Sequence, residues 1–301
     1  MSTGKIFAAK KLSDQFLTLE RFARSSESAF LAQNFKHENV LSAVAQYFVK
    51  ETSLAIIIMP LMDESLTNFM DRHGRISEKT ARKLMSDIIK GMIFIHSKNY
   101  IHRDLKPENI LIKNGQCQVA DFDAVVKTNS PREEIKGTWT YSAPEVMIEE
   151  YSVLSIAQDI WSLGVIFYEI LSSEFLFQAD DEYLEKVTQI QVRGIKNLNE
   201  IEHVSSEGIQ ALSSMLQIDP ANRSPLEKLL DEYFEPKSKP NNENDERRTG
   251  FRGVVKTTCN EISTQTDDVT MTDATQRQKK RKVLTRLFRW LTRCCSRKKK
   301  F

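Results

Sequence analysis

Three short motifs in a fixed order place the strongest constraint on this chain. They read HRDLKPEN at 102–109, DFD at 121–123 and APE at 143–145. Between the first two motifs, residues 109–112 and 116–120 predict short strands that are joined by an Asn-Gly turn. Two acidic residues, Asp104 and Asp121, therefore lie in loops that flank a strand pair.

In this order and spacing the motifs resemble the catalytic half of eukaryotic protein kinases. The resemblance extends from about Gly4 to Phe234. It implies an α+β, two-lobed protein kinase fold over residues 1–235, in which an abbreviated β-sheet lobe (1–62) precedes a larger, mainly α-helical lobe (63–235).

The resemblance assigns a role to each polar residue of the first two motifs. Phosphoryl transfer needs a group that orients the attacking hydroxyl, cations that spread the charge of the moving phosphoryl group, and carboxylates that hold those cations. Asp104 is implied to be the catalytic base and Lys106 to touch the transferred phosphate. Asn109 and Asp121 are implied to hold Mg²⁺, which prefers hard oxygen ligands. ATP and Mg²⁺ are the expected cofactors, and Lys106 is typical of kinases that act on Ser and Thr of protein substrates.

A lysine near the start of the chain resembles the nucleotide-binding lysine of the family. Lys10 ends the strand-like run FAAK, as the lysine of the kinase motif V-A-I-K does. Its expected partner is a helix carboxylate, Glu27, with Glu20 as the second choice. A lysine at the end of a short apolar run also fits a strand edge with no ligand.

The run from Ile56 to Met62 resembles the strand and hinge that grip adenine. Met59 then takes the gatekeeper position, and backbone groups of Pro60 and Met62 bond to the edge of the base. An apolar run of this kind also fits a strand that is simply part of the core.

The resemblance implies three further contacts. They are hydrogen bonds of Thr138 with Asp104 and Lys106, a clamp between Glu145 and Arg223, and anchoring of the catalytic loop by Asp159. The Asp159–Leu171 segment is apolar on every side, which predicts a helix buried in the core.

The sequence departs from the kinase pattern at its start. Only nine residues precede Lys10, so the two strands and the glycine-rich loop that kinases place before this lysine are expected to be missing. Losing two hydrogen bonds from that loop to phosphate, at about 1.5 kcal/mol each, weakens nucleotide binding roughly a hundredfold. The alternative is therefore a pseudokinase, a scaffold or binding module that transfers phosphate weakly or not at all.

Two further departures concern charge. Asp123 stands where the family has Gly, a residue that tolerates left-handed backbone angles; we expect Asp123 to limit rotation of Asp121 and to add negative charge beside the metal. Arg103 pairs with a phosphorylated loop in related kinases, and Glu133 and Glu134 are placed to substitute for that phosphate. A solvated acidic loop is the alternative.

The rest of the chain follows helical and strand periodicities. Helical patterns occupy 12–33, with a break near Ser25, and begin again after Ser77, which is a good N-cap. A β-branched run at 54–59 predicts a strand. Three more helices are expected at 182–193, 206–217 and 225–231.

Charge divides the chain into a body and a tail. Lys and Arg number 43 and Asp and Glu 41, yet 12 of the basic residues and none of the acidic ones lie at 277–301. Residues 236–276 form a polar linker, and the tail after it is basic and amphipathic. A tail of this kind fits a membrane surface, with Cys294 and Cys295 as palmitoylation sites, a nuclear-import receptor, or a disordered segment without a partner.

Composition excludes several classes of protein. With 40% hydrophobic residues the chain is neither fibrous nor wholly disordered. Four scattered cysteines predict a reducing compartment and no disulfide framework. Nothing near Met1 predicts a secretory signal, so we expect an intracellular protein, at a membrane surface or in the nucleus if the tail directs it there. No specific nucleic-acid partner is predicted.

Overall fold

A computed structural model of the chain describes residues 5–12, 18–128, 130, 137–147, 154–177, 201 and 203–235. Several predictions fall outside these residues. They are the acidic pair Glu133 and Glu134, the helix at 182–193, the linker at 236–276 and the tail at 277–301. The described residues combine antiparallel sheets with helices, which confirms the predicted α+β fold class.

The first part of the chain folds around a three-stranded antiparallel sheet. Its strands are β1 (Phe7–Lys11), β2 (Ala45–Val49) and β3 (Leu54–Pro60), in the order β1-β3-β2. Strand β3 matches its prediction and extends one residue to Pro60, where the ladder ends. Strand β2 was not predicted, because its sequence AQYFV lacks a clean alternation of apolar and polar residues.

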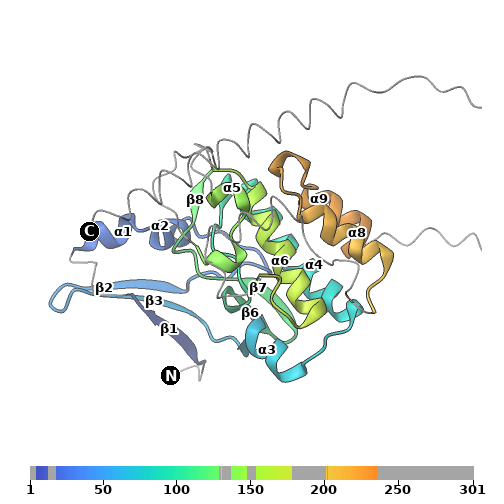
Figure 1. Cartoon of the computed structure of the whole chain (residues 1–301). Coiled ribbons are helices and arrows are strands. Elements are labelled where there is room, and N and C mark those ends of the chain that lie inside the picture. The colour runs from blue at the N-terminus through green and yellow to red at the C-terminus, as the bar shows by residue number, and fades with distance from the viewer. Residues whose placement is uncertain are drawn as a thin grey trace, which may run out of the picture. The chain divides into compact units, whose positions relative to one another are not determined.

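Two short helices lie beside this sheet (Figure 1), where the sequence predicted an interrupted helical segment. They are α1 (Leu19–Arg24) and α2 (Ser26–Ala32). Ser25 ends the first helix and caps the second, since its extended backbone lets its Oγ accept from the amide of Ser28 at 3.3 Å. The Oγ of Ser28 donates to Gln46 of β2 at 2.7 Å, which ties α2 to the sheet.

Most of the core lies in the helical part of the chain. Its long helices are α4 (Glu78–Ser97), α6 (Ala157–Ser172) and α8 (Ser206–Met215), and shorter ones are α3 (Leu66–His73), α5 (Pro144–Met147) and α9 (Leu226–Leu229). Ser77 caps α4 and nearly every residue of α6 is buried, as predicted. The helix expected at 225–231 is α9 followed by a π-helical turn, Leu230–Phe234. Within the described residues, no helix is both long and apolar enough to span a bilayer.

A hairpin between these two parts positions the loops that carry the motifs. Strands β6 (Ile110–Lys113) and β7 (Gln116–Val119) pair around the predicted Asn-Gly turn, and β4 (Glu64–Ser65) adds to their edge. Both turn residues have positive φ, 51° at Asn114 and 75° at Gly115, as a two-residue hairpin of this type requires. Another pair, β5 (Tyr100–Ile101) and β8 (Val126–Lys127), brackets the same region.

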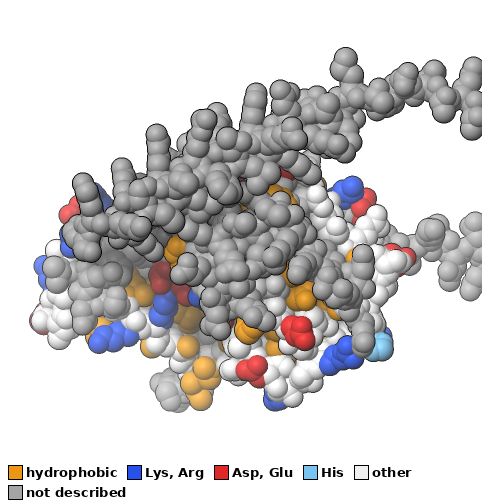
Figure 2. Space-filling model, viewed as in Figure 1, with side chains coloured by type: hydrophobic (Ala, Val, Ile, Leu, Met, Phe, Trp, Pro, Cys, Tyr) orange, Lys and Arg blue, Asp and Glu red, His pale blue; other side chains and the backbone are white. Residues whose placement is uncertain are grey.

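The segment 39–41 connects the hairpin to the first sheet. The amide of Leu41 donates to the carbonyl of Val119, and the amide of Val119 donates to Asn39, each at 2.9 Å. Helix α4 approaches this segment so closely that a Cβ on Gly91 would collide with the carbonyl oxygen of Asn39. The described surface visible in Figure 2 carries basic, acidic and hydrophobic side chains in small separate groups.

Candidate active site

Lys10 of β1 meets three carboxylates. Its Nζ lies 2.8 Å from Oε2 of Glu27, 2.7 Å from Oδ1 of Asp121 and 3.3 Å from Oδ2 of Asp123. Glu27 is therefore the partner that the structure selects, whereas Glu20 is exposed and pairs with Arg24. The contact joins the β-sheet part of the chain to the loop that follows the hairpin.

The titration of this cluster reflects its burial and its charge. Burial raises the pKa of Glu27 to about 7, against the opposing effect of the Lys10 ammonium. Burial by itself lowers the pKa of Lys10, but the charges and hydrogen bonds of Glu27 and Asp121 outweigh it and hold that pKa above its usual range. Lys10 is thus a fixed positive charge at the edge of the sheet.

Asp104 is the centre of a second cluster. Its Oδ1 accepts hydrogen bonds from the amide and the hydroxyl of Thr138, both at 2.8 Å, and its Oδ2 lies 3.1 Å from Nζ of Lys106. Lys106 also donates to the Thr138 hydroxyl at 2.8 Å, so the predicted contacts of Thr138 are confirmed. Burial opposes ionisation of Asp104, but these hydrogen bonds outweigh it and lower the pKa of the carboxyl.

Asp159 of α6 fixes the loop that carries Asp104. Asp159 is fully buried and accepts hydrogen bonds from the amides of His102 and Arg103, each at 2.9 Å. The predicted anchoring of the catalytic loop is therefore confirmed. Arg103 has a φ of 72°, and this left-handed angle turns the chain toward Asp104.

Left-handed geometry also occurs at the DFD motif, but not where the sequence suggested it. Asp121 has a φ of 63°, whereas Asp123 lies outside the left-handed region. The strain expected from replacing Gly by Asp is therefore absent at Asp123. Whether Asp123 limits rotation of Asp121 stays a prediction.

The polar residues near Asp121 offer ligands that suit Mg²⁺. One carboxylate oxygen from each of Glu27, Asp121 and Asp123 lies within 4.8 Å of the others. The amide nitrogen of Asn109 donates to the backbone carbonyl of Asp104 at 2.8 Å and to its Oδ2 at 3.2 Å, which leaves the Asn109 amide oxygen as the remaining ligand atom. Hard oxygen donors of this kind fit Mg²⁺.

A cavity of about 250 Å³ lies beside these residues, slightly below the range of roughly 300 to 1,000 Å³ typical of small-molecule pockets. Its charged and polar lining residues include Lys10, Glu27, Asn109 and Asp121, and its apolar lining residues include Ala8, Ile57, Met59 and Leu111. Met59 therefore reaches the cavity, as its predicted gatekeeper position requires. Met62 does not line this cavity, and its predicted contact with a base stays a prediction.

The clamp between Glu145 and Arg223 holds the APE motif. Arg223 is buried and donates from its Nη2 to Oε2 of Glu145 at 2.7 Å. The same guanidinium donates to the backbone carbonyls of Ala157 and Gln217, at 2.8 and 2.9 Å. The predicted pairing is confirmed, and it joins the loop after Thr138 to the helical core.

Sequence reasoning missed one buried carboxyl near the motifs. Glu169 of α6 accepts a hydrogen bond from the hydroxyl of Tyr141 at 2.8 Å, and burial raises the pKa of Glu169 to about 7. A charged residue in an otherwise apolar helix was the available signal, but its partner lies far away in the sequence.

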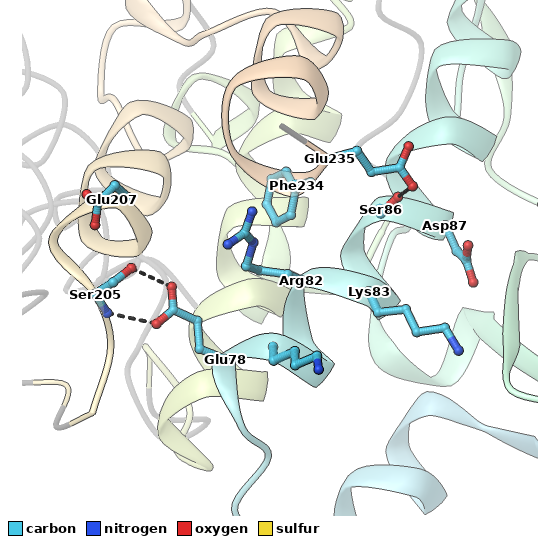
Figure 3. Close-up of a pocket in the computed structure, with 10 residues that line it drawn as sticks. Glu78, Arg82, Lys83, Ser86, Asp87, Ser205, Glu207, Phe234 and Glu235 are labelled. Carbon is cyan, nitrogen blue, oxygen red and sulfur yellow. Dashed lines mark hydrogen bonds between the residues drawn. The ribbon is translucent and has the colours of Figure 1, made fainter. Parts of the chain in front are cut away.

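A larger hollow of about 710 Å³ lies elsewhere, along α4 and the start of α8 (Figure 3). Its carboxylates already accept bonds from nearby groups: Glu78 from the amide of Ser205 at 2.8 Å, and Glu235 from the hydroxyl of Ser86 at 2.7 Å. None of the predicted site residues lines it. Four of them, Lys10, Glu27, Asn109 and Asp121, line the smaller cavity instead.

Residues 1–234 match the family described as the protein kinase domain. The chain belongs to this protein kinase family. Relatives of this kinase domain include cyclin-dependent kinase F-4 of Oryza sativa subsp. japonica, 27% identical over 77% of this chain and 56% of that protein. Extracellular signal-regulated kinase 1 of Dictyostelium discoideum is 30% identical over 78% and 48%, and mitogen-activated protein kinase 13 of Mus musculus is 31% identical over 72% and 60%. The kinase chain spans about half the length of these curated relatives.

Proposed function

We propose that this chain is an ATP-dependent protein kinase that transfers the γ-phosphate to Ser or Thr hydroxyls of protein substrates. The observation that carries the proposal is that Asn109 connects two clusters of charged residues, because it lines the cavity beside one cluster and bonds to the other. Lys10, Glu27 and Asp121 form the first, and Asp104 and Lys106 belong to the second.

The residues around Asp104 suit the orientation of an attacking hydroxyl. Because its pKa is lowered, the Asp104 carboxyl is ionised at neutral pH and can accept the proton of a substrate hydroxyl. Lys106 places a positive charge 3.1 Å from that carboxylate, where negative charge grows on the transferred group. Thr138 keeps both side chains in position through three hydrogen bonds.

The residues around Lys10 suit a triphosphate. Lys10 carries a fixed positive charge, and Glu27 orients it. When bound, Mg²⁺ would neutralise phosphate charge, and Asn109 and Asp121 are the residues that would hold it. The apolar walls at Ala8 and Leu111 fit the flat faces of a base. The name of one relative, mitogen-activated protein kinase 13, supports proteins as the substrates.

Transfer of labelled phosphate from ATP to generic protein substrates tests this proposal. We expect transfer by the unaltered protein and a loss of at least about a hundredfold in Asp104→Asn, which keeps the shape of the side chain but removes the base. Glu20→Gln is the matched control, because it also neutralises one carboxylate but lies on the exposed face of α1. Equal rates in the unaltered protein and Asp104→Asn would refute the proposal.

A second candidate is a pseudokinase that binds nucleotide or a partner without efficient transfer. The observation that favours it is Asp123, which stands in place of the family glycine and adds a third carboxylate beside Lys10. Nucleotide binding by the full chain, combined with no phosphate transfer that depends on Asp104, would support this candidate over the enzyme.

We also propose that the basic segment 277–301 directs the protein to a membrane surface, with nuclear import as the alternative. Its alternation of basic and apolar residues and the pair Cys294-Cys295 support this proposal. Replacing both cysteines by Ser and following the protein by cell fractionation separates the two: loss from membranes without loss from nuclei favours attachment, and an unchanged membrane fraction contradicts it.

A further inference from the structure

Asp123 changes the charge of the cluster around Lys10. One ammonium faces three carboxylates there, those of Glu27, Asp121 and Asp123. An ammonium has three N–H groups to donate, so all three are engaged before a phosphate arrives. A chain with Gly at 123 would present one carboxylate fewer to the same ligand.

The three contacts with Lys10 differ in strength. Glu27 and Asp121 lie at 2.8 and 2.7 Å from Nζ, whereas Asp123 lies at 3.3 Å. The side chain of Asp123 is 63% exposed, compared with 3% for Glu27. Asp123 is thus the most weakly held partner, and it faces the open side of the cluster.

The position of Asp123 costs the fold no backbone strain, since its φ lies outside the left-handed region. Its carboxylate also has an oxygen within 4.8 Å of an oxygen of Asp121 and of Glu27. Like charges at this separation repel one another; the single charge of Lys10 offsets part of this repulsion, and a divalent cation would offset more of it. The side chain is therefore placed to penalise an anion and to favour a cation.

We propose that Asp123 makes nucleotide binding depend on a divalent cation. A triphosphate without metal must approach Lys10 against the charge of Asp123 and must displace that side chain from the ammonium. A triphosphate that carries Mg²⁺ meets an additional carboxylate near Asp121 as a favourable neighbour. This inference rests on the proposed nucleotide-binding function and adds a selectivity that the family motif with Gly would lack.

The size of the effect follows from the single negative charge of Asp123, which is partly exposed. Repulsion between this charge and a phosphate charge about 6 Å away should change the dissociation constant by roughly tenfold. This value lies between those expected in water and in the protein interior. We therefore expect the metal-free nucleotide to bind about tenfold more tightly once the charge is removed. The Mg²⁺ complex should change by less than about threefold.

Calorimetric titration of the full chain with ATP tests the proposal, once with excess Mg²⁺ and once with a chelator. The readout is the dissociation constant measured with the chelator divided by the one measured with Mg²⁺, and it needs no turnover. Asp123→Asn removes the charge and keeps the shape, while Asp123→Glu keeps the charge and should retain the ratio. Glu20→Gln controls for loss of one exposed carboxylate far from Lys10, and the melting temperature of each variant confirms folding.

The outcomes separate this inference from the proposed function. A ratio that falls about tenfold in Asp123→Asn, and is unchanged in Glu20→Gln, supports the inference. Nucleotide binding with the same ratio in all variants overturns the inference and leaves the proposed function standing. Failure of the unaltered protein to bind ATP with Mg²⁺ overturns both.

Discussion

Removing the guanidinium of Arg223 should strongly destabilise the fold. The side chain is fully buried and bonds to Glu145 through two nitrogens. It also donates to the backbone carbonyls of Ala157 and Gln217, and lies 5.1 Å from the ring of Trp161. In Arg223→Met, the aliphatic part is retained, but Glu145 is left as a buried carboxylate without a partner.

The expected loss follows from that unpaired charge. Breaking a buried ion pair by removing one partner costs about 3–5 kcal/mol, because the remaining charge stays desolvated. The carbonyls of Ala157 and Gln217 also lose donors, at about 1 kcal/mol each, but these losses overlap with the first. We expect Arg223→Met to lower the free energy of unfolding by about 3–5 kcal/mol.

Urea unfolding, followed by tryptophan fluorescence, to which buried Trp161 contributes, measures this loss. In the double variant Arg223→Met, Glu145→Gln, both charges are gone, so the loss should be at least about 2 kcal/mol smaller than the sum of the two single losses. Arg24→Met is the matched control, because Arg24 and Glu20 form an exposed pair with side chains 79% and 70% accessible, and its loss should stay below about 1 kcal/mol. A loss below 1 kcal/mol in Arg223→Met, or strict additivity with Glu145→Gln, would refute the reasoning.

Two further predictions concern the hydroxyl near the base and the buried carboxyl of α6. Thr138→Val removes the hydrogen bond that the hydroxyl donates to Asp104 and the one that it accepts from Lys106. In steady-state kinetics, kcat should therefore fall roughly 10- to 100-fold with KM little changed, and Thr138→Ser should restore kcat. Burial raises the pKa of Glu169 to about 7 in the folded protein, against an ordinary 4.5. The contribution of Glu169 to the free energy of unfolding is therefore fully present below about pH 4.5 and is lost as the pH rises through 7. The loss amounts to at most about 3 kcal/mol. Unfolding at pH 5 and pH 8 should therefore show Glu169→Gln gaining more stability relative to the unaltered protein at pH 8 than at pH 5, and an equal difference at both pH values would contradict this.

Local sequence patterns predicted the elements that local interactions form. Ser77 and Ser25 act within a few residues of themselves, as caps whose hydroxyls accept backbone hydrogen bonds. The Asn-Gly turn sets its own backbone angles, and a helix apolar on all faces must be buried wherever it packs. The short loop from Asp104 to Asn109, by contrast, was assigned from its resemblance to the kinase motif.

Contacts between distant residues could be expected only through the resemblance to kinases. Lys10 and Asp121 are 111 positions apart, and periodicity says nothing about the distance between their side chains. The choice between Glu20 and Glu27 depends on which face of α1 and α2 packs toward β1. Strand β2 is stabilised by pairing with β3 rather than by its own pattern.

The sequence by itself determined the order of the motifs, the α+β class and the residue types available for phosphoryl transfer, because these are properties of the chain or of neighbouring residues. Only the tertiary structure decided that Asp123 shares Lys10 with Glu27 and Asp121, and that the left-handed backbone angle falls on Asp121. The tertiary structure also brought Glu169 within hydrogen-bonding distance of the Tyr141 hydroxyl. These features depend on separations of a few ångströms between elements far apart in the chain, and packing of the whole domain fixes those separations.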